Sequence, residues 1–206
     1  MPRLQDPLSL EFILLGLINN EPIHGYDLYK KINDLEGISL IWHIKQGKLY
    51  ALLEKLEGAE LVSSKILPGK THLTRKEYQI TPNGRVAFLS WVNQPVKHGR
   101  DMRQEFLAKL YFAEVSGVGA AKELIDKQKV ACGKWVSNYS TTVQTINPEQ
   151  QYEKLIYQYR ISQTKAMLSW LDYCLDEICG NEILPTITND TQDSGLEEID
   201  KSKKRL

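Results

Sequence analysis

The chain has 206 residues, of which 42% are hydrophobic and 25% charged, values typical of a globular protein with one large or two small domains. Its 26 basic residues balance 26 acidic ones, so overall charge does not favour nucleic acid and any basic surface must be local. No apolar run approaches the about 20 residues that span a bilayer, and no basic-then-apolar start indicates a signal peptide, so we expect a cytoplasmic protein that does not contact membranes.

The first half of the chain begins with three predicted helices. The segment "DPLSLEFILLGLINNEP" is apolar on nearly every side, which predicts a buried helix that starts at Pro7 and ends before Pro22. "IHGYDLYKKINDL" predicts a second helix ending at Gly37, and "ISLIWHIK" predicts a linker. In "QGKLYALLEKLEGAELV" one apolar stripe predicts a third helix, with Leu49, Leu52, Leu53 and Leu56 at helical spacing.

A hairpin and a fourth helix follow. "LVSSKIL" and "RKEYQIT" alternate in polarity around the turn-forming "PGKTH", which predicts two strands and a polar, basic loop. Thr81 as a cap and Pro82 at the first helical position predict a helix that stops at Pro95.

After "PVKHG" the chain predicts only helices. Apolar positions from 102 to 113 indicate one helix, a heptad-like seam from 121 to 146 indicates a long second one, and a third runs from about 149 to 179. The tail has few residues that could build a core, so we expect disorder there. The predicted domains are 1–95, a helical domain 96–183 and the tail 184–206.

The order of the first elements predicts a winged helix-turn-helix, in which the third helix enters the major groove. The charges of that helix oppose its dipole, because Lys48 lies in the first turn while Glu54 and Glu57 lie toward the end. Each charge placed against the dipole destabilises the helix by about 0.3–1 kcal/mol. Such an arrangement is understandable if the N-terminal end of the helix faces DNA phosphates and the glutamates point away from them. We therefore assign DNA contact to Lys45, Gln46, Lys48 and Tyr50.

The hairpin is locally basic, since Glu77 is the one acid between residues 65 and 85. A basic hairpin fits contact with phosphates, and we assign that contact to Lys65, Lys70, Arg75 and Lys76. Two alternatives stay open: lysines that protect an exposed strand edge, and a winged helix that binds protein without specific DNA binding.

The first 95 residues or so resemble the PadR-like transcriptional regulators. The resemblance rests on "ILLGLINNEPIHGYDLYKKI", "WHIKQGKLYALLEKLEGAELV" and "RKEYQITPNGRVAFLSWV". The next segment, "RDMRQEFLAKLYFAE", is similar to the start of the virulence-activator-like C-terminal domain. The resemblance implies a homodimer that regulates bacterial transcription, usually by repression, and it places Tyr26 at the DNA face. Within these motifs, Gly25 has no side chain and so lets the turn at the start of the second helix approach its neighbours closely.

A winged helix reads a half-site, so a symmetric dimer would bind a palindromic operator with half-sites about 34–36 Å apart. We expect the long helices to form the dimer through Phe106, Leu110, Ile125, Trp135, Tyr139, Tyr159 and Trp170. Related regulators sense aromatic or lipophilic effectors, for which the candidate pocket residues are Trp42, Trp91 and Trp135, although aromatic residues at helical spacing are more often core.

No glycine-rich phosphate loop, carboxylate pair or nucleophile–base pattern predicts an enzyme, and we expect no cofactor. The three cysteines lack metal-ligand spacing and fit reduced thiols, namely Cys132, Cys174 and Cys179. The sequence does not define the operator, the regulated genes, the sign of regulation or the effector.

Overall fold

The structure is a computed structural model that describes residues 9–34, 37–67 and 75–180. Lys70 and the tail from 184 onward lie outside these residues. The elements in chain order are α1 (Ser9–Ile18), β1 (Ile23–His24), α2 (Gly25–Asp34), α3 (Ile38–Ile41), α4 (Gln46–Gly58), β2 (Val62–Leu67), β3 (Arg75–Ile80), α5 (Pro82–Val92), the 3₁₀ helix η1 (Gly99–Arg103), α6 (Glu105–Val115), α7 (Val118–Thr145) and α8 (Gln151–Gly180).

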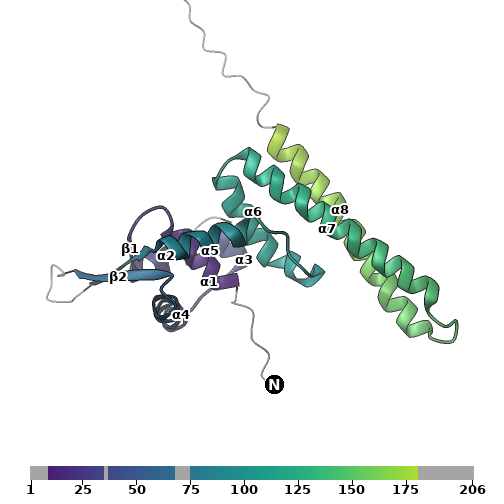
Figure 1. Ribbon diagram of the computed structural model, residues 1–206, viewed down its shortest axis with the longest axis horizontal. Helices are drawn as coiled ribbons and strands as arrows, with labels where there is room; N and C mark the ends of the chain where they lie inside the picture. Colours follow the sequence, from purple (N-terminus) through teal and green to yellow (C-terminus); the bar gives the residue numbers. More distant parts are fainter. Residues whose placement is uncertain (1–8, 35–36, 68–74, 181–206) are drawn as a thin grey trace, which may run out of the picture.

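The predicted mainly helical fold with an N-terminal winged helix-turn-helix is confirmed. Figure 1 shows α1 to α5 and the small sheet as one body, from which α7 and α8 extend side by side as a long arm. In this view α4 and the β2–β3 hairpin lie on the opposite side of the body from the arm. No helix of the described residues is long and apolar enough to cross a membrane.

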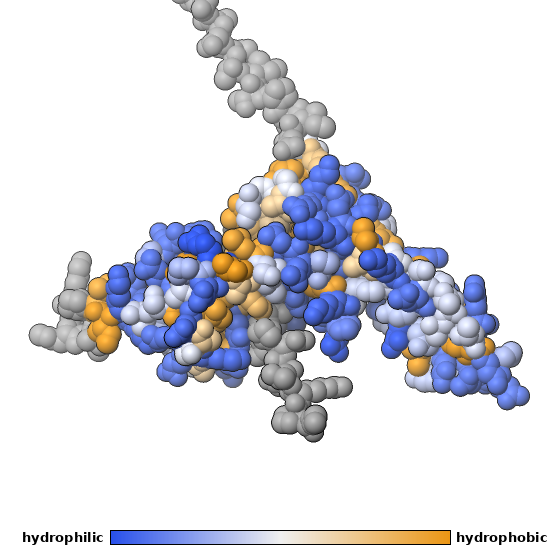
Figure 2. Space-filling view, in the orientation of Figure 1, coloured by the Kyte–Doolittle hydropathy of each residue, from blue (hydrophilic) through white to orange (hydrophobic). Residues whose placement is uncertain are grey.

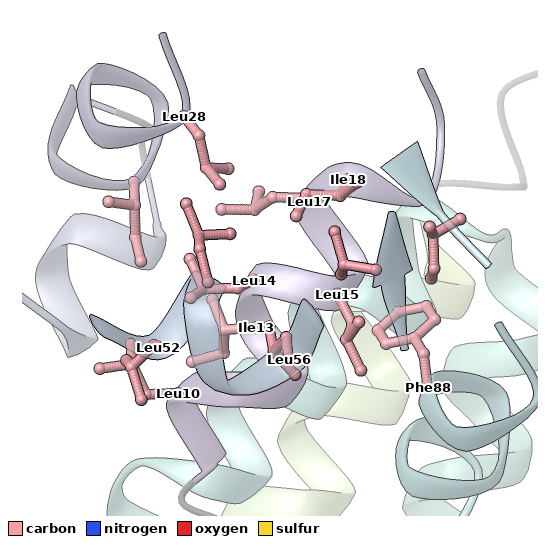
Figure 3. Packing of buried hydrophobic residues seen from close by; sticks show 14 of the residues in the cluster. Leu10, Ile13, Leu14, Leu15, Leu17, Ile18, Leu28, Leu52, Leu56 and Phe88 are labelled. Atoms are coloured by element: carbon pink, nitrogen blue, oxygen red, sulfur yellow. The ribbon is translucent and has the colours of Figure 1, made fainter. Parts of the chain in front are cut away.

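The first core surrounds α1. This helix is apolar on nearly all sides, and Ile13, Leu14 and Leu15 have no exposed surface. In Figure 3 its side chains meet those of the neighbouring helices, with Leu28 coming from α2, Leu52 and Leu56 from α4, and Phe88 from α5. The predicted stripe of α4 is thereby confirmed as its buried face, which leaves the other face of α4 available to solvent.

The sheet of the described residues has three strands in the order β1-β3-β2, one more than predicted. Ile23 and His24 pair antiparallel with Tyr78 and Glu77 of β3, so the prediction that a helix starts at Ile23 is wrong. The segment predicted as a linker also contains the short helix α3, directly after Gly37, which has a φ of 93°.

Thr81 joins α5 to the hairpin. Its Oγ1 accepts a hydrogen bond from the Gly84 N–H at 3.0 Å, which confirms the predicted cap, and donates one to the Glu60 carbonyl at 2.7 Å. The Thr81 N–H also bonds the Leu61 carbonyl at 3.1 Å. Gly84 lies so close to this chain that a Cβ would sit 2.0 Å from the Leu61 oxygen.

The second core lies under α7 and α8, and α6 contributes to both cores. Ala108 and Phe112 of α6 pack in the first core, whereas Phe106 and Ala113 pack in the second. The single helix predicted over 102–113 is divided at Gln104, whose ψ of −58° with a φ of −133° interrupts the helix between η1 and α6.

The long helices pack along one face each. The predicted seam of α7 is buried through its first half, at Ala121, Ile125, Gln128 and Cys132. The face of α8 that packs inward carries its buried residues, which are Ile161, Thr164, Leu171 and Cys174. The three cysteines are free thiols, as predicted.

Candidate nucleic-acid interface

The turn between α2 and α4 is fixed by Asn33, a residue that the sequence reasoning missed. Its side-chain amide donates to the Tyr29 carbonyl at 2.9 Å and to the Ile44 carbonyl at 3.3 Å, and its oxygen accepts from the Ile44 N–H at 3.3 Å. Ile44 is buried two residues before α4, so Asn33 sets where that helix begins. An asparagine in an amphipathic helix gives no signal of this bridge, because the partner lies 11 residues away.

The N-terminal end of α4 is exposed. Lys45 is the N-cap residue without a side-chain cap, and Gln46 and Lys48 in the first turn are exposed, with no acid beside them. Neither lysine forms an ion pair with any residue that the structure describes. Two uncompensated cations and an amide therefore stand at the positive end of a helix dipole, where anions are favoured.

The start of α2 packs against α4 through Gly25 and Tyr50. A Cβ at Gly25 would lie 2.7 Å from Cε1 of the half-buried Tyr50 ring, so the close approach predicted for this glycine is present. Tyr26 is exposed, and Lys30 Nζ lies 4.9 Å from the centre of its ring. The Nδ1 atom of His24 is buried and has no hydrogen-bond partner among the described residues.

The hairpin presents two exposed cations and one paired cation. Lys65 and Arg75 are exposed and form no ion pair with described residues. Lys76 is half-buried, and its Nζ lies 2.6 Å from Glu57 of α4. Beside the cations, Ile66 of β2 is an exposed apolar residue, and Figure 2 shows hydrophobic surface at this outer end of the hairpin.

Glu57, in the last turn of α4, is paired within the chain with Lys76 and Ser64 of the hairpin. Hydrogen bonds from Lys76 and then Ser64 lower the pKa of the Glu57 carboxyl below its usual range. The bond with Glu57 likewise raises the pKa of the Lys76 ammonium. Both groups therefore stay charged at neutral pH, and the pair joins α4 to the hairpin.

A cavity of about 370 Å³ lies beside the segment that connects α5 to η1. Two of the three predicted pocket residues, Trp42 and Trp91, line it, whereas Trp135 packs against the second core on α7 and is not among its lining residues. Phe12 stacks on Trp91 with ring centres 5.1 Å apart, and Trp42 Nε1 is buried without a hydrogen-bond partner in the described residues.

Lys109 is one of several charged residues that line this cavity, together with Lys97, Arg100, Asp101 and Glu105. Its Nζ lies 2.9 Å from Glu105, donates to the Gln94 carbonyl at 3.0 Å and lies 5.2 Å from the Trp91 ring centre. Burial lowers the pKa of the Lys109 ammonium, although Glu105 opposes that shift. The cavity thus combines aromatic side chains with charged residues of both signs.

Most of the predicted dimerisation residues belong to the core of the chain itself. Phe106 and Ile125 have no exposed surface in the single chain. Leu110, Trp135 and Trp170 pack against the second core. Tyr139 contacts Tyr157 of α8 with ring centres 6.0 Å apart, while Tyr159 is 61% exposed.

Among the described residues, no group of three or more His, Cys, Asp or Glu side chains is placed to hold a metal ion. The chemistry that the exposed residues do offer is hydrogen bonding and charge, at the end of α4 and on the hairpin.

Comparison with known proteins gives two matches that follow the two parts of the structure. Residues 14–90 match the transcriptional regulator PadR-like family, and residues 102–178 match the virulence activator alpha C-terminal family. The negative transcriptional regulator PadR of Bacillus subtilis (strain 168) is 22% identical over 178 residues, which cover 81% of this chain and 95% of that protein.

Two solved structures are similar to the chain. The crystal structure of Bacillus subtilis PadR in complex with operator DNA is 22% identical, covers 84% of this chain and 99% of that chain, and has a TM-score of 0.43. The PadR-like transcriptional regulator BC1756 from Bacillus cereus is 22% identical, covers 85% and 98%, and has a TM-score of 0.39.

Proposed function

Since residues 14–90 match the PadR-like family of transcriptional regulators and residues 102–178 match the virulence activator alpha C-terminal family, we propose that the chain is a cytoplasmic repressor that binds a palindromic operator as a homodimer. The observation that carries this proposal is the exposed N-terminal end of α4. Gln46 lies there beside Lys45 and Lys48, and neither lysine forms an ion pair with a described residue. Lysines there fit phosphates or guanine edges, and glutamine fits the adenine edge. Lys65 and Arg75 of the adjacent hairpin would add phosphate contacts.

The test uses the duplex that the wild-type protein selects from a random pool. Affinity for this duplex is measured against salt concentration for the wild type, for Lys48→Gln and for Lys134→Gln, an exposed lysine of α7 that serves as the control. Lys48→Gln should reduce the slope of log affinity against log salt by about 1, because one phosphate contact is lost. The control should match the wild type.

Two results would reject the assignment. If Lys48→Gln binds like the wild type at every salt concentration, α4 does not read DNA. If no duplex is enriched from the pool, the winged helix is a protein-binding module, which is the alternative function.

The homodimer is supported by an exposed stripe on α8. Tyr152, Leu155, Tyr159 and Tyr173 follow one another at intervals of three, four and fourteen residues, so they share one face, and each is more than half exposed. The stripe lies beside an apolar groove of about 380 Å³ that includes Met102, Leu107 and Trp170. Aromatic stripes at heptad-like spacing pair well with a second helix of the same kind, and a symmetric copy supplies one.

Sedimentation equilibrium of full-length variants tests this interface. Leu155→Glu in the stripe should give a monomer, whereas Val130→Glu, at a similarly exposed apolar position of α7, should leave the dimer intact. A dimer that survives Leu155→Glu would place the interface elsewhere, and a wild-type monomer would remove the homodimer from the proposal.

The cavity that Trp42 and Trp91 line supports a further part of the proposal, release by a small aromatic effector. Its aromatic walls fit a planar ring, and Lys97, an exposed lining residue that forms no ion pair with the described residues, fits a carboxylate. A panel of aromatic carboxylates and their uncharged amides is titrated against tryptophan fluorescence and duplex binding. The carboxylates should respond more strongly, and no response to any compound would eliminate this site.

A further inference from the structure

One acidic side chain of α4 holds both strands of the hairpin. Glu57 lies in the last turn of the helix, and its two carboxylate oxygens take one partner each. Oε1 accepts from Ser64 Oγ of β2 at 2.5 Å, and Oε2 accepts from Lys76 Nζ of β3 at 2.6 Å. Since the two strands are also paired at Ser64↔Tyr78 and Ile66↔Lys76, this carboxylate fixes the helix end to both strands of the hairpin.

The same contacts take Lys76 out of the set of available cations. Its ammonium is paired with Glu57 at 2.6 Å and lies 5.3 Å from the centre of the Tyr78 ring. To reach a phosphate it would have to break a charge-assisted hydrogen bond and leave the glutamate unpaired beside a polyanion. Lys65 and Arg75 carry no such cost, because both are exposed and unpaired among the described residues.

We propose that Glu57 is a positioning residue for the hairpin and that Lys76 acts with it, rather than as a phosphate contact. The inference rests on the proposed DNA-binding function. In a winged helix the recognition helix enters the groove while the hairpin contacts the backbone or adjacent groove. The angle between the two therefore determines which duplexes satisfy both contacts, and the Glu57–Lys76 pair bridges the elements that form this angle.

A charge reversal separates positioning from phosphate contact. Glu57→Lys and Lys76→Glu are made singly and together in the full-length protein. The readout is the ratio of affinities for the selected duplex and for a scrambled duplex, which cancels general effects of net charge. Each single reversal places like charges face to face and should lower this ratio about tenfold, while the double reversal restores the pair and should return the ratio to within about threefold of wild type.

The opposite result overturns the inference. If Lys76 contacts a phosphate, the double reversal leaves a carboxylate at that phosphate and the ratio stays low. Two charge-neutralising variants distinguish the same two roles of Lys76. Lys76→Gln should keep the wild-type slope of log affinity against log salt concentration, whereas Lys65→Gln should reduce that slope by about 1. A loss of about 1 with Lys76→Gln would identify Lys76 as a phosphate contact.

Failure of this inference differs from failure of the proposed function. If Lys48→Gln and Lys65→Gln lower the salt slope but the double reversal does not rescue the affinity ratio, DNA binding stands and the positioning role falls. If no variant changes the slope, the DNA-binding assignment itself falls. The melting temperature of each variant is measured alongside, and rescue of the affinity ratio between variants of equal melting temperature excludes a role in stability alone.

Discussion

Replacing Gly84 by alanine should destabilise the winged helix through a contact with backbone. The added Cβ would lie 2.0 Å from the Leu61 carbonyl oxygen and 2.9 Å from Ile80 Cγ1. A carbonyl cannot rotate away as a side chain can, so α5 must move from the chain before β2. The Thr81 N–H to Leu61 bond of 3.1 Å and the Thr81 hydroxyl to Glu60 bond of 2.7 Å would then be stretched or lost.

The size of the effect follows from these contacts. Overpacking costs about 1–3 kcal/mol, and each weakened hydrogen bond about 1 kcal/mol. The higher helix propensity of alanine returns about 1 kcal/mol. The free energy of unfolding should therefore fall by about 2–4 kcal/mol, which in a chain of this size lowers the melting temperature by about 4–16 °C.

Circular dichroism during heating and urea unfolding measures this change, with Gly133→Ala as the control. Gly133 lies in the middle of α7 and a Cβ there would meet nothing within 4 Å, so this variant should gain about 0.5–1 kcal/mol. The reasoning is refuted if Gly84→Ala melts at or above the wild-type temperature, or if Gly133→Ala loses as much stability.

Three other substitutions test the site and the connection between the parts. Gly25→Ala should push the Tyr50 ring aside and weaken binding of the selected duplex about tenfold, or about 1.4 kcal/mol, with a smaller loss of stability. If binding is unchanged, the position of the Tyr50 ring does not affect DNA contact. Gln128→Leu leaves the Val96 N–H, now bonded at 2.8 Å, without an acceptor and should cost about 1–3 kcal/mol, so an unchanged melting temperature would contradict this reading. Because burial lowers the pKa of Lys109, the folded protein holds that proton less tightly than the unfolded chain. The stability of the wild type relative to Lys109→Met, followed by urea unfolding, should thus rise with pH up to about 10.4, and a fall over that range would be inconsistent with the shift.

Local signals in the sequence predicted the elements that depend on nearest neighbours. The leucines of α4 repeat at helical spacing and form its buried face, and Thr81 with Pro82 starts α5, because both patterns depend on residues within one or two turns. The exposed N-terminal end of α4 followed from the positions of Lys45 and Lys48, which precede the first leucine of the stripe, Leu49.

Features that depend on distant partners were not predicted. β1 consists of two residues and exists through its pairing with β3, more than 50 positions away, so its own sequence carries no strand pattern. The ion pair of Glu57 with Lys76 was not predicted, because the two residues lie 19 positions apart. Both faces of α8 carry apolar residues, and periodicity alone does not decide which face an adjacent helix covers.

The position of α6 has a consequence for the dynamics of the chain. This helix places Phe112 in one core and Phe106 in the other, so α6 loses part of its packing contacts when either core loosens. Its amides should then exchange with solvent only in openings that involve both halves, as a single cooperative unit. Rotation of the arm formed by α7 and α8 would reach α1 and α5 through the contacts that α6 makes with both cores.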